Sequence, residues 1–283
     1  MKRIKKIALW SSLLLYVIIV MSFVSGKRHN AVCHSFDLII RDSSNQCFID
    51  KEDITDLLKK SGIAFIGKPV DSIPIALIER ELVKHPAVKN AEIYLTIYGK
   101  VVIELEQRSP IVRVINRTGE SFYIDEEGRL MPLIEKSASR VLVANGNIKF
   151  SAVKNKYAYR CNDVYQRIDP YSIQKQNLTP DYDIPALKQN DRNELDEIFS
   201  FAKFIAHQEF WKSQIEQMYI VKRNDFELIP RVGDHIIVFG GVEDSKHKLN
   251  NLLAMYRDGF KRVGWNKYKV INIKYKGQVI CSK

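Results

Sequence analysis

The chain has 283 residues, of which 46% are hydrophobic and 10% aromatic, and this composition excludes disorder throughout. The formal net charge is +11, but six basic residues and no acid lie in the first 28 residues, which leaves +5 over the other 255. No Arg-rich run or basic-aromatic alternation accompanies that charge, so we do not expect nucleic acid as a partner.

The first predicted element is a transmembrane helix over residues 7–24, a run without charge that is long enough to cross a hydrocarbon core of about 30 Å. Residues 1–6 form a basic tail before it, and residues 25–35 a linker after it. The more basic flank comes first, so we expect a cytoplasmic N-terminus and the bulk of the chain in the periplasm. A cleaved signal peptide is the alternative, although the apolar run exceeds the usual signal core.

Four cysteines lie outside that run, namely Cys33, Cys47, Cys161 and Cys281. In an oxidising compartment they allow three disulfide pairings, among which the sequence does not choose. No C-x-x-C spacing occurs, so neither a redox motif nor a zinc knuckle is predicted.

Residues 36–109 have the pattern of a small β-α-α-β-β module. The stretches "FDLIIRD" and "QCFID" resemble strands, and a helix capped by Asp50 follows, ending at Gly62. A second helix, capped by Asp71 or Ser72, ends before Pro86. Alternation on both sides of a glycine turn then predicts a hairpin. The apolar positions are Ile54, Leu57 and Leu58 in the first helix, Ile75, Ile78 and Leu82 in the second, and Ile93, Leu95 and Ile97 before the turn at Gly99.

Residues 110–283 are predicted to form a mixed β domain with two flanking helices, which makes the whole chain α+β. A polar excursion without steady period occupies residues 151–186, and a helix capped at Asn190 or Asp191 follows it. Two short strand-like runs come next, then "HIIVFGG", whose continuous apolar residues suggest a strand buried on both faces. The expected helix faces are Leu195, Ile198, Phe199, Ala202 and Ile205 in the first helix, and Leu249, Leu252, Leu253, Tyr256 and Phe260 in the second.

The last stretch, "KYKVINIKYKGQVICSK", alternates strongly. Ile271, Ile273 and Tyr275 fall on one side of an extended chain, whereas Asn272, Lys274 and Lys276 fall on the other. Few residues follow, so we expect an edge strand whose backbone is open to a partner strand, with the lysines able to pair with its carboxylates. The alternative is a last core strand whose lysines prevent edge pairing.

No convergent set of catalytic groups is apparent, so we predict no catalytic residue, cofactor or metal. "VFGGVED" lacks the third glycine of a dinucleotide fingerprint and the Gly-Lys-Ser/Thr of a P-loop, which favours a bare turn. His235 and His247 do not have the spacing of zinc ligands. His207 and Glu209, near a helix end, could in principle act as acid and base, but charged residues in such positions are usually solvated. A membrane-tethered hydrolase is therefore the least favoured of the three functional hypotheses.

Several motifs resemble the FtsQ/DivIB bacterial cell-division proteins. Pro86-Ala87-Val88 is similar to the P-x-V motif with which the family enters the second strand of its POTRA domain. Residues 106–110 resemble a degraded form of the E-R-x-P motif that ends the third strand. Phe122 to Gly128 resembles the strand and turn "yyiD-x-x-G". The terminal run, Trp265, Tyr268, Ile271, Ile273 and Tyr275, is similar to the family's last strand.

The resemblance implies a POTRA domain at residues 36–109 and a non-enzymatic divisome scaffold of the inner membrane, concentrated at the septum, that helps regulate septal peptidoglycan synthesis. It implies binding of FtsB, within a complex with FtsL, at the terminal strand, where the partner-binding candidates are Lys274, Tyr275, Lys276, Gly277 and Gln278. Lys274 stands where an arginine is expected. The POTRA surface from Ile75 to Ile97 would meet other divisome components. The alternative is a POTRA-bearing secretion or transport component of the envelope that binds client strands.

Overall fold

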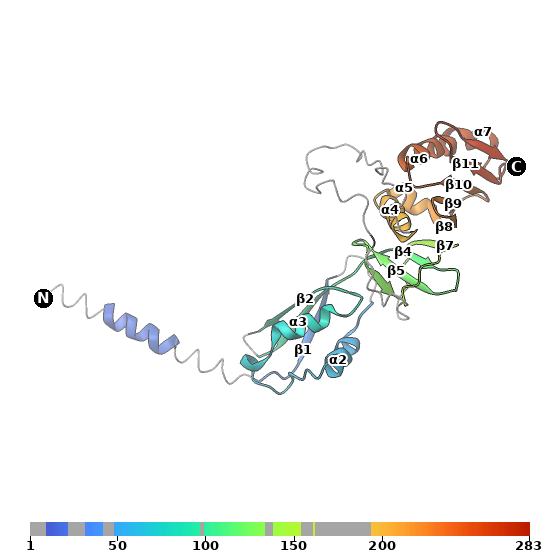
Figure 1. Ribbon diagram of the computed structural model, residues 1–283. Helices are drawn as coiled ribbons and strands as arrows, with labels where there is room; N and C mark the ends of the chain where they lie inside the picture. Colours follow the sequence, from blue (N-terminus) through green and yellow to red (C-terminus); the bar gives the residue numbers. More distant parts are fainter. Residues whose placement is uncertain are drawn as a thin grey trace. The chain divides into compact units, whose positions relative to one another are not determined.

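The computed structural model describes residues 10–21, 32–41, 48–96, 99–133, 138–153, 161 and 194–283. The chain divides into two compact units, Met1–Arg108 and Ser109–Lys283 (Figure 1). Residues 10–21 are helical, and their side chains are exposed. Among the helices described, none is long and apolar enough to cross a membrane, and the remainder of the predicted span at residues 7–24 lies outside the described residues.

The first unit contains a three-stranded sheet in the order β1-β3-β2. Its strands are β1 (Phe36–Arg41), β2 (Val88–Leu95) and β3 (Val101–Gln107). β1 runs parallel to β3, whereas β2 and β3 form the predicted antiparallel hairpin. Gly99 has a φ of +78°, a left-handed conformation that glycine adopts without steric cost. Ile97, expected on this hairpin, lies outside the described residues.

Helix α2 (Lys51–Lys60) begins as the sequence predicts. The Asp50 carboxylate accepts from the Asp53 amide, and the Asp53 side chain accepts from the Asp50 amide, which completes a capping box. The second predicted strand is not present at residues 48–50, where the Phe48 amide donates to the Gln107 side chain, and the rest of it lies outside the described residues. Residues 48–50 instead lead directly into the cap of α2.

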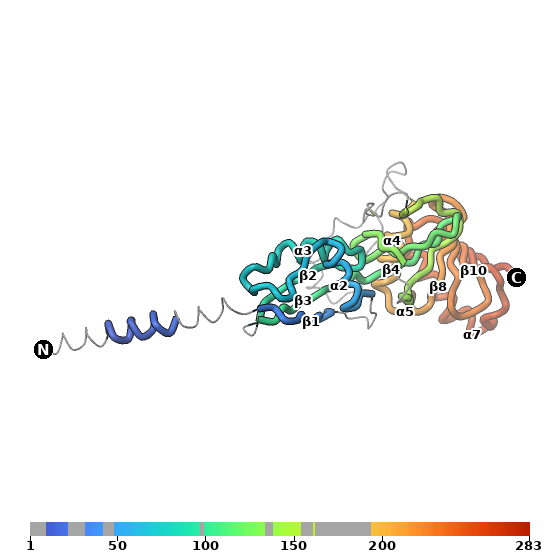
Figure 2. Tube along the Cα trace, turned by 90° about the horizontal axis from the view of Figure 1, so that it is seen from below, coloured from blue at the N-terminus to red at the C-terminus, as the bar shows by residue number. Residues whose placement is uncertain are grey.

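Helix α3 (Ile75–Val83) begins later than predicted. The expected caps Asp71 and Ser72 lie in a single 3₁₀ turn, η1 (Val70–Ser72), and Pro74 occupies the N-cap position. Ile78 and Leu82 are fully buried, as their spacing predicts. Together α2 and α3 lie along one side of the three strands (Figure 2).

The described residues of the second unit form a nine-stranded sheet in the order β12-β11-β10-β9-β8-β7-β4-β5-β6. The first four of its strands in the sequence are β4 (Pro110–Ile115), β5 (Ser121–Asp125), β6 (Leu130–Pro132) and β7 (Leu142–Gly146). The other five are β8 (Ile215–Lys222), β9 (Asp225–Pro230), β10 (Ile236–Gly240), β11 (Val270–Asn272) and β12 (Ile280–Ser282). Three pairs are parallel, namely β4 with β7, β7 with β8 and β10 with β11.

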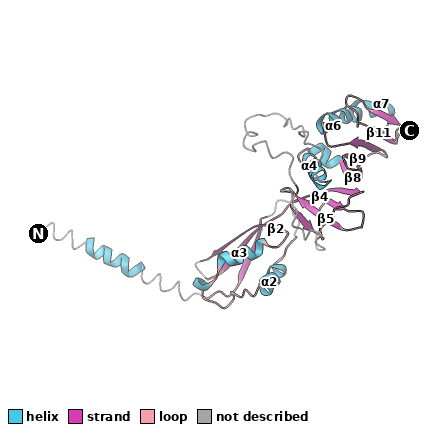
Figure 3. Cartoon of the chain, in the orientation of Figure 1, coloured by secondary structure: helices cyan, strands magenta, loops and turns pink. Residues whose placement is uncertain are grey.

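Helices α4 (Glu194–Ala206) and α5 (Glu209–Gln214) precede β8 in the sequence, and α6 (Ser245–Ala254) follows β10. Figure 3 shows α4 and α6 beside the strands of this unit. α6 continues through a π-helical turn, η4 (Met255–Gly259), into α7 (Phe260–Val263). Most of the polar excursion predicted at residues 151–186, and the predicted caps Asn190 and Asp191, lie outside the described residues.

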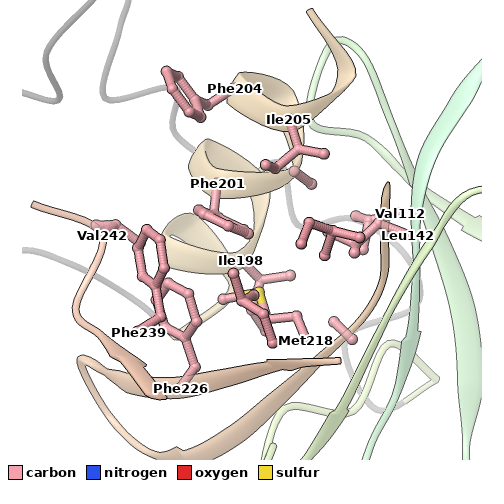
Figure 4. Packing of buried hydrophobic residues seen from close by; sticks show 14 of the residues in the cluster. Val112, Leu142, Ile198, Phe201, Phe204, Ile205, Met218, Phe226, Phe239 and Val242 are labelled. Carbon is pink, nitrogen blue, oxygen red and sulfur yellow. The ribbon is translucent and has the colours of Figure 1, made fainter. Parts of the chain in front are cut away.

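The core of this unit lies between α4 and the sheet (Figure 4). The Phe201 ring packs 5.0 Å from that of Phe226 and 5.1 Å from that of Phe239. The predicted apolar stripe of α4 is buried, but so are Asp196, Glu197 and Ser200. α4 is therefore enclosed on more sides than an amphipathic surface helix is. The spacing of its hydrophobic residues does not predict this enclosure.

β10 buries one face completely and the other only in part. Ile237 and Phe239 are inaccessible, but the Ile236 side chain is 42% exposed, which corrects the prediction of a strand buried on both faces. An uninterrupted apolar run shows that a strand is hydrophobic without showing that both of its faces are covered.

The predicted terminal strand is shorter than its alternation suggests. β11 ends at Asn272, and the chain then returns as β12, which pairs antiparallel with β11. Ile271 and Ile273 are buried as expected, whereas Tyr275 is 58% exposed because it lies beyond the strand. The edge of the sheet is therefore β12 and not the strand that carries Ile271.

Candidate docking site at the end of the sheet

All five predicted partner-binding residues lie in the connection between β11 and β12, at residues 273–279. The Lys274 amide donates to the Asn272 side-chain oxygen at 3.0 Å, and the Gln278 amide donates to the Tyr275 carbonyl at 3.3 Å. Gly277 has a φ of +71°, as such a reversal requires. The predicted residues thus form a compact turn next to the edge strand.

Lys274 is paired within the chain. Its Nζ lies 3.0 and 3.1 Å from the two carboxylate oxygens of Asp225, at the start of β9. The Lys274 and Asp225 side chains are only 35% and 17% exposed, so this pair is partly shielded from water. Lys274 therefore has a carboxylate partner within its own chain, which the alternation of the last stretch does not predict. Sequence reasoning also missed Asp225, since 49 residues separate the two.

Gly240 makes room for the Lys274 stem, and Gly241 makes room for two neighbouring side chains. A Cβ on Gly240 would lie 2.7 Å from Cγ of Lys274, closer than side-chain carbons approach, and Gly240 also has a φ of +77°. A Cβ on Gly241 would meet the Asn224 and Glu243 side chains at 2.2 and 2.4 Å. The "VFGGVED" motif is therefore a structural turn, as predicted, and it lets the lysine stem cross the backbone.

A groove of about 280 Å³ lies between the N-terminal half of α6 and the β11–β12 connection. Lys248 on its α6 side is 9% exposed, and its Nζ donates to the Gly241 carbonyl at 2.8 Å. Burial lowers the pKa of this ammonium. Lys274, Tyr275, Lys276 and Gly277 form the opposite wall, so four of the five predicted residues share one concave surface, and Gln278 does not line it.

The β12 strand is an edge with an apolar flank. It pairs with β11 on one side and stands last in the order of the described strands. Ile280 is 48% exposed. An incoming strand could therefore form main-chain hydrogen bonds along β12 and contact Ile280 and Tyr275.

His235 lies just before β10 in an aromatic cluster. It is 4% exposed, its Nε2 lies 2.9 Å from the Tyr256 hydroxyl, and its buried Nδ1 has no hydrogen-bond partner among the described residues. Burial lowers the pKa of His235 and raises that of Tyr256. The His235 ring also packs edge-on against Phe260, 5.5 Å away.

The other candidate groups do not converge. His207 contacts the Lys203 carbonyl through Nδ1 at 2.7 Å, and His247 is exposed on the groove wall. Within the described residues, no three His, Cys, Asp or Glu side chains come together as metal ligands. Cys33, Cys161 and Cys281 are free thiols in the structure, and Cys47 lies outside the described residues.

Comparison with known protein families agrees with this architecture. The model of the POTRA-like domain matches residues 31–106, which contain both helices and, except for the last residue of β3, the first sheet. The chain thus carries a POTRA-like domain ahead of a large mixed sheet. The model described as FtsQ/DivIB, C-terminal related, matches residues 109–282, more than half of the chain. The chain therefore belongs to the FtsQ/DivIB family, as its motifs predict. No curated protein matches it.

Domains of these two families fit a cell-division scaffold, and they are generally not catalytic. The candidate site agrees with that class in its chemistry. It offers a strand edge, a groove and exposed side chains, which suit binding to another protein.

Proposed function

We propose that the chain is a non-enzymatic scaffold of the bacterial division machinery that binds FtsB, in a complex with FtsL, at the β12 edge. The observation that supports this proposal best is the edge position of β12, next to the exposed side chains of Ile280 and Tyr275. Backbone pairing would supply affinity, and the flanking side chains would supply specificity. Through that complex the chain would help to regulate septal peptidoglycan synthesis.

The same proposal includes a membrane anchor. The uncharged run at residues 7–24 would span the inner membrane, with the basic tail in the cytoplasm and both domains in the periplasm. The surface from Ile75 to Ile97 would contact other division proteins at the septum. Carbonate extraction of cell membranes tests the anchor: the full-length chain should stay in the pellet, and its release into the supernatant would contradict the proposed span.

Photo-crosslinking in cells tests the docking edge. Probes replace Lys276 and Ile280 one at a time, and a matched probe replaces Lys212, which is also exposed but lies on α5. Lys276 and Ile280 should capture FtsB, as identified by mass spectrometry, whereas Lys212 should not. Equal capture from all three positions, or capture only of diverse unfolded envelope proteins, would argue against a division scaffold with this docking edge.

A further inference from the structure

We propose that Lys274 is a positioning residue and does not itself contact the partner. Its ion pair with Asp225 fixes the β11–β12 connection, so that Tyr275 and Lys276 are held ready for an incoming strand. This inference rests on the proposed function, because it assigns roles to residues of the same docking site.

The contacts of Lys274 show how it is held. Asp225 binds its ammonium group with both oxygens, at 3.0 and 3.1 Å, and the stem of the lysine crosses Gly240. A second lysine, Lys222, lies 3.8 Å from the same carboxylate, but its side chain is 71% exposed. Removing the Lys274 ammonium should therefore cost more stability than removing that of Lys222, because Lys274 is better shielded and exposed ion pairs contribute little.

The ion pair joins two turns that are distant in the sequence. Asp225 follows the β8–β9 turn, and Lys274 is the second residue of the β11–β12 connection, so their pairing ties the connection to the start of β9. Tyr275 and Lys276 come directly after the tied residue and are both exposed. A loop that is ordered before binding avoids the entropy loss of ordering it during binding.

An approaching carboxylate would compete with Asp225 for Lys274. Asp225 already offers two oxygens in a partly shielded site, and breaking that pair would leave its carboxylate only the exposed Lys222, 3.8 Å away. Lys276 requires no such exchange for an electrostatic contact because its side chain is exposed. The geometry therefore assigns positioning of the turn to Lys274 and contact with the partner to Lys276.

A charge-swap experiment on the full-length chain tests this division, with FtsB as the probe. Lys274→Asp and Asp225→Lys alone should each weaken binding about tenfold, which corresponds to about 1.4 kcal/mol. The double variant should recover to within about threefold of the wild type, because the pair is rebuilt with reversed polarity. If Lys274 contacted the partner directly, the double variant would bind as weakly as Lys274→Asp, and that result would overturn the proposal.

Amide hydrogen exchange supplies a readout that does not depend on the partner. The Gln278 amide, whose hydrogen bond closes the turn at 3.3 Å, should exchange faster in both single variants and return toward wild-type protection in the double variant. Unchanged protection in the single variants would overturn the positioning role even if FtsB did not bind. Absence of FtsB binding to the wild type, with protection restored in the double variant, would reject the proposed function and leave the positioning of the turn intact.

Three further variants complete the design. Lys276→Ala should weaken FtsB binding without changing exchange at Gln278, since the side chain lies outside the ion pair. If a charge reversal prevents folding, Lys274→Gln and Asp225→Asn measure the same loss without placing like charges together. Retained protection and wild-type affinity in both neutral variants would contradict the proposal.

Discussion

The Glu79 carboxylate accepts a hydrogen bond from the Ile93 amide at 2.9 Å and so occupies the outer edge of β2. The other edge of the same sheet has an equivalent contact, in which Lys51 Nζ donates to the Phe36 carbonyl at 2.7 Å. Each edge strand of the POTRA-like domain is thus covered at one point by a charged side chain from a helix. An added strand would have to displace that side chain.

Replacing Glu79 with alanine should release the Ile93 amide. We expect faster hydrogen exchange at that amide and a loss of about 1–2 kcal/mol in the free energy of unfolding, because a partly buried donor loses its acceptor. Glu81→Ala is the matched control, since Glu81 is on the same helix but bonds Lys84 at the surface. If both variants gave the same exchange at Ile93, the edge contact would have no measurable role.

Replacing Asp50 with alanine should weaken α2. Asp50 accepts hydrogen bonds from the Glu52 and Asp53 amides, and loss of such a cap costs about 1 kcal/mol. Thermal unfolding measures the change, and Asp50→Ser should recover most of it because serine also caps well. Asp56→Ala, at an exposed position in the same helix, should change the midpoint little. An equal loss in the two alanine variants would contradict the capping role.

Replacing Gly240 with alanine should destabilise the second domain. The new Cβ would lie 2.7 Å from the Lys274 stem at a φ of +77°, so we expect a loss of about 1–3 kcal/mol. Gly119→Ala separates the two causes, because Gly119 lies in a turn of the same domain with a φ of +86° but has no described atom within 4 Å of an added Cβ. Denaturant unfolding followed by near-ultraviolet circular dichroism should show the larger loss for Gly240. A loss of the same size at Gly119 would leave only backbone strain as the explanation.

Acidification should destabilise the aromatic cluster around His235. Burial holds the pKa of His235 below its ordinary value of about 6.5, so the unfolded chain takes up the proton first. The contribution of this group to stability is therefore complete above about pH 6.5 and declines as the pH falls below it. His235→Gln should reduce the decline in the unfolding free energy between pH 7.5 and 5.5. Exposed His247→Gln is the control, and an unchanged slope in His235→Gln would exclude His235 as its source.

The sequence predicts the local features of this fold well. The cap at Asp50, the hairpin around Gly99 and the buried spacing of Ile78 and Leu82 each depend on residues close together in the chain. The end of β11 was not predictable in the same way. Alternation continues through Tyr275, although pairing with β10 and β12 stops at Asn272. Strand length depends on the neighbours, which the pattern does not contain.

The candidate site could be located from its motifs but not described from them. The five predicted residues do lie together in the β11–β12 connection. What the sequence could not show is the partner of Lys274, because only the fold brings Asp225 next to it. The edge strand was also missed, since β12 has three residues, too few for a periodic signal.

The parallel pairing of β7 with β8 has a consequence for the order of folding. β4 to β7 are close in sequence, as are β8 to β12, but β7 ends at Gly146 and β8 begins at Ile215. Each group can form from short-range contacts, whereas joining them requires closure of a long stretch of chain. We therefore expect the β7–β8 ladder to assemble late and to limit the folding rate of the domain. The end of the sheet that carries β12 could then form before the sheet as a whole is complete.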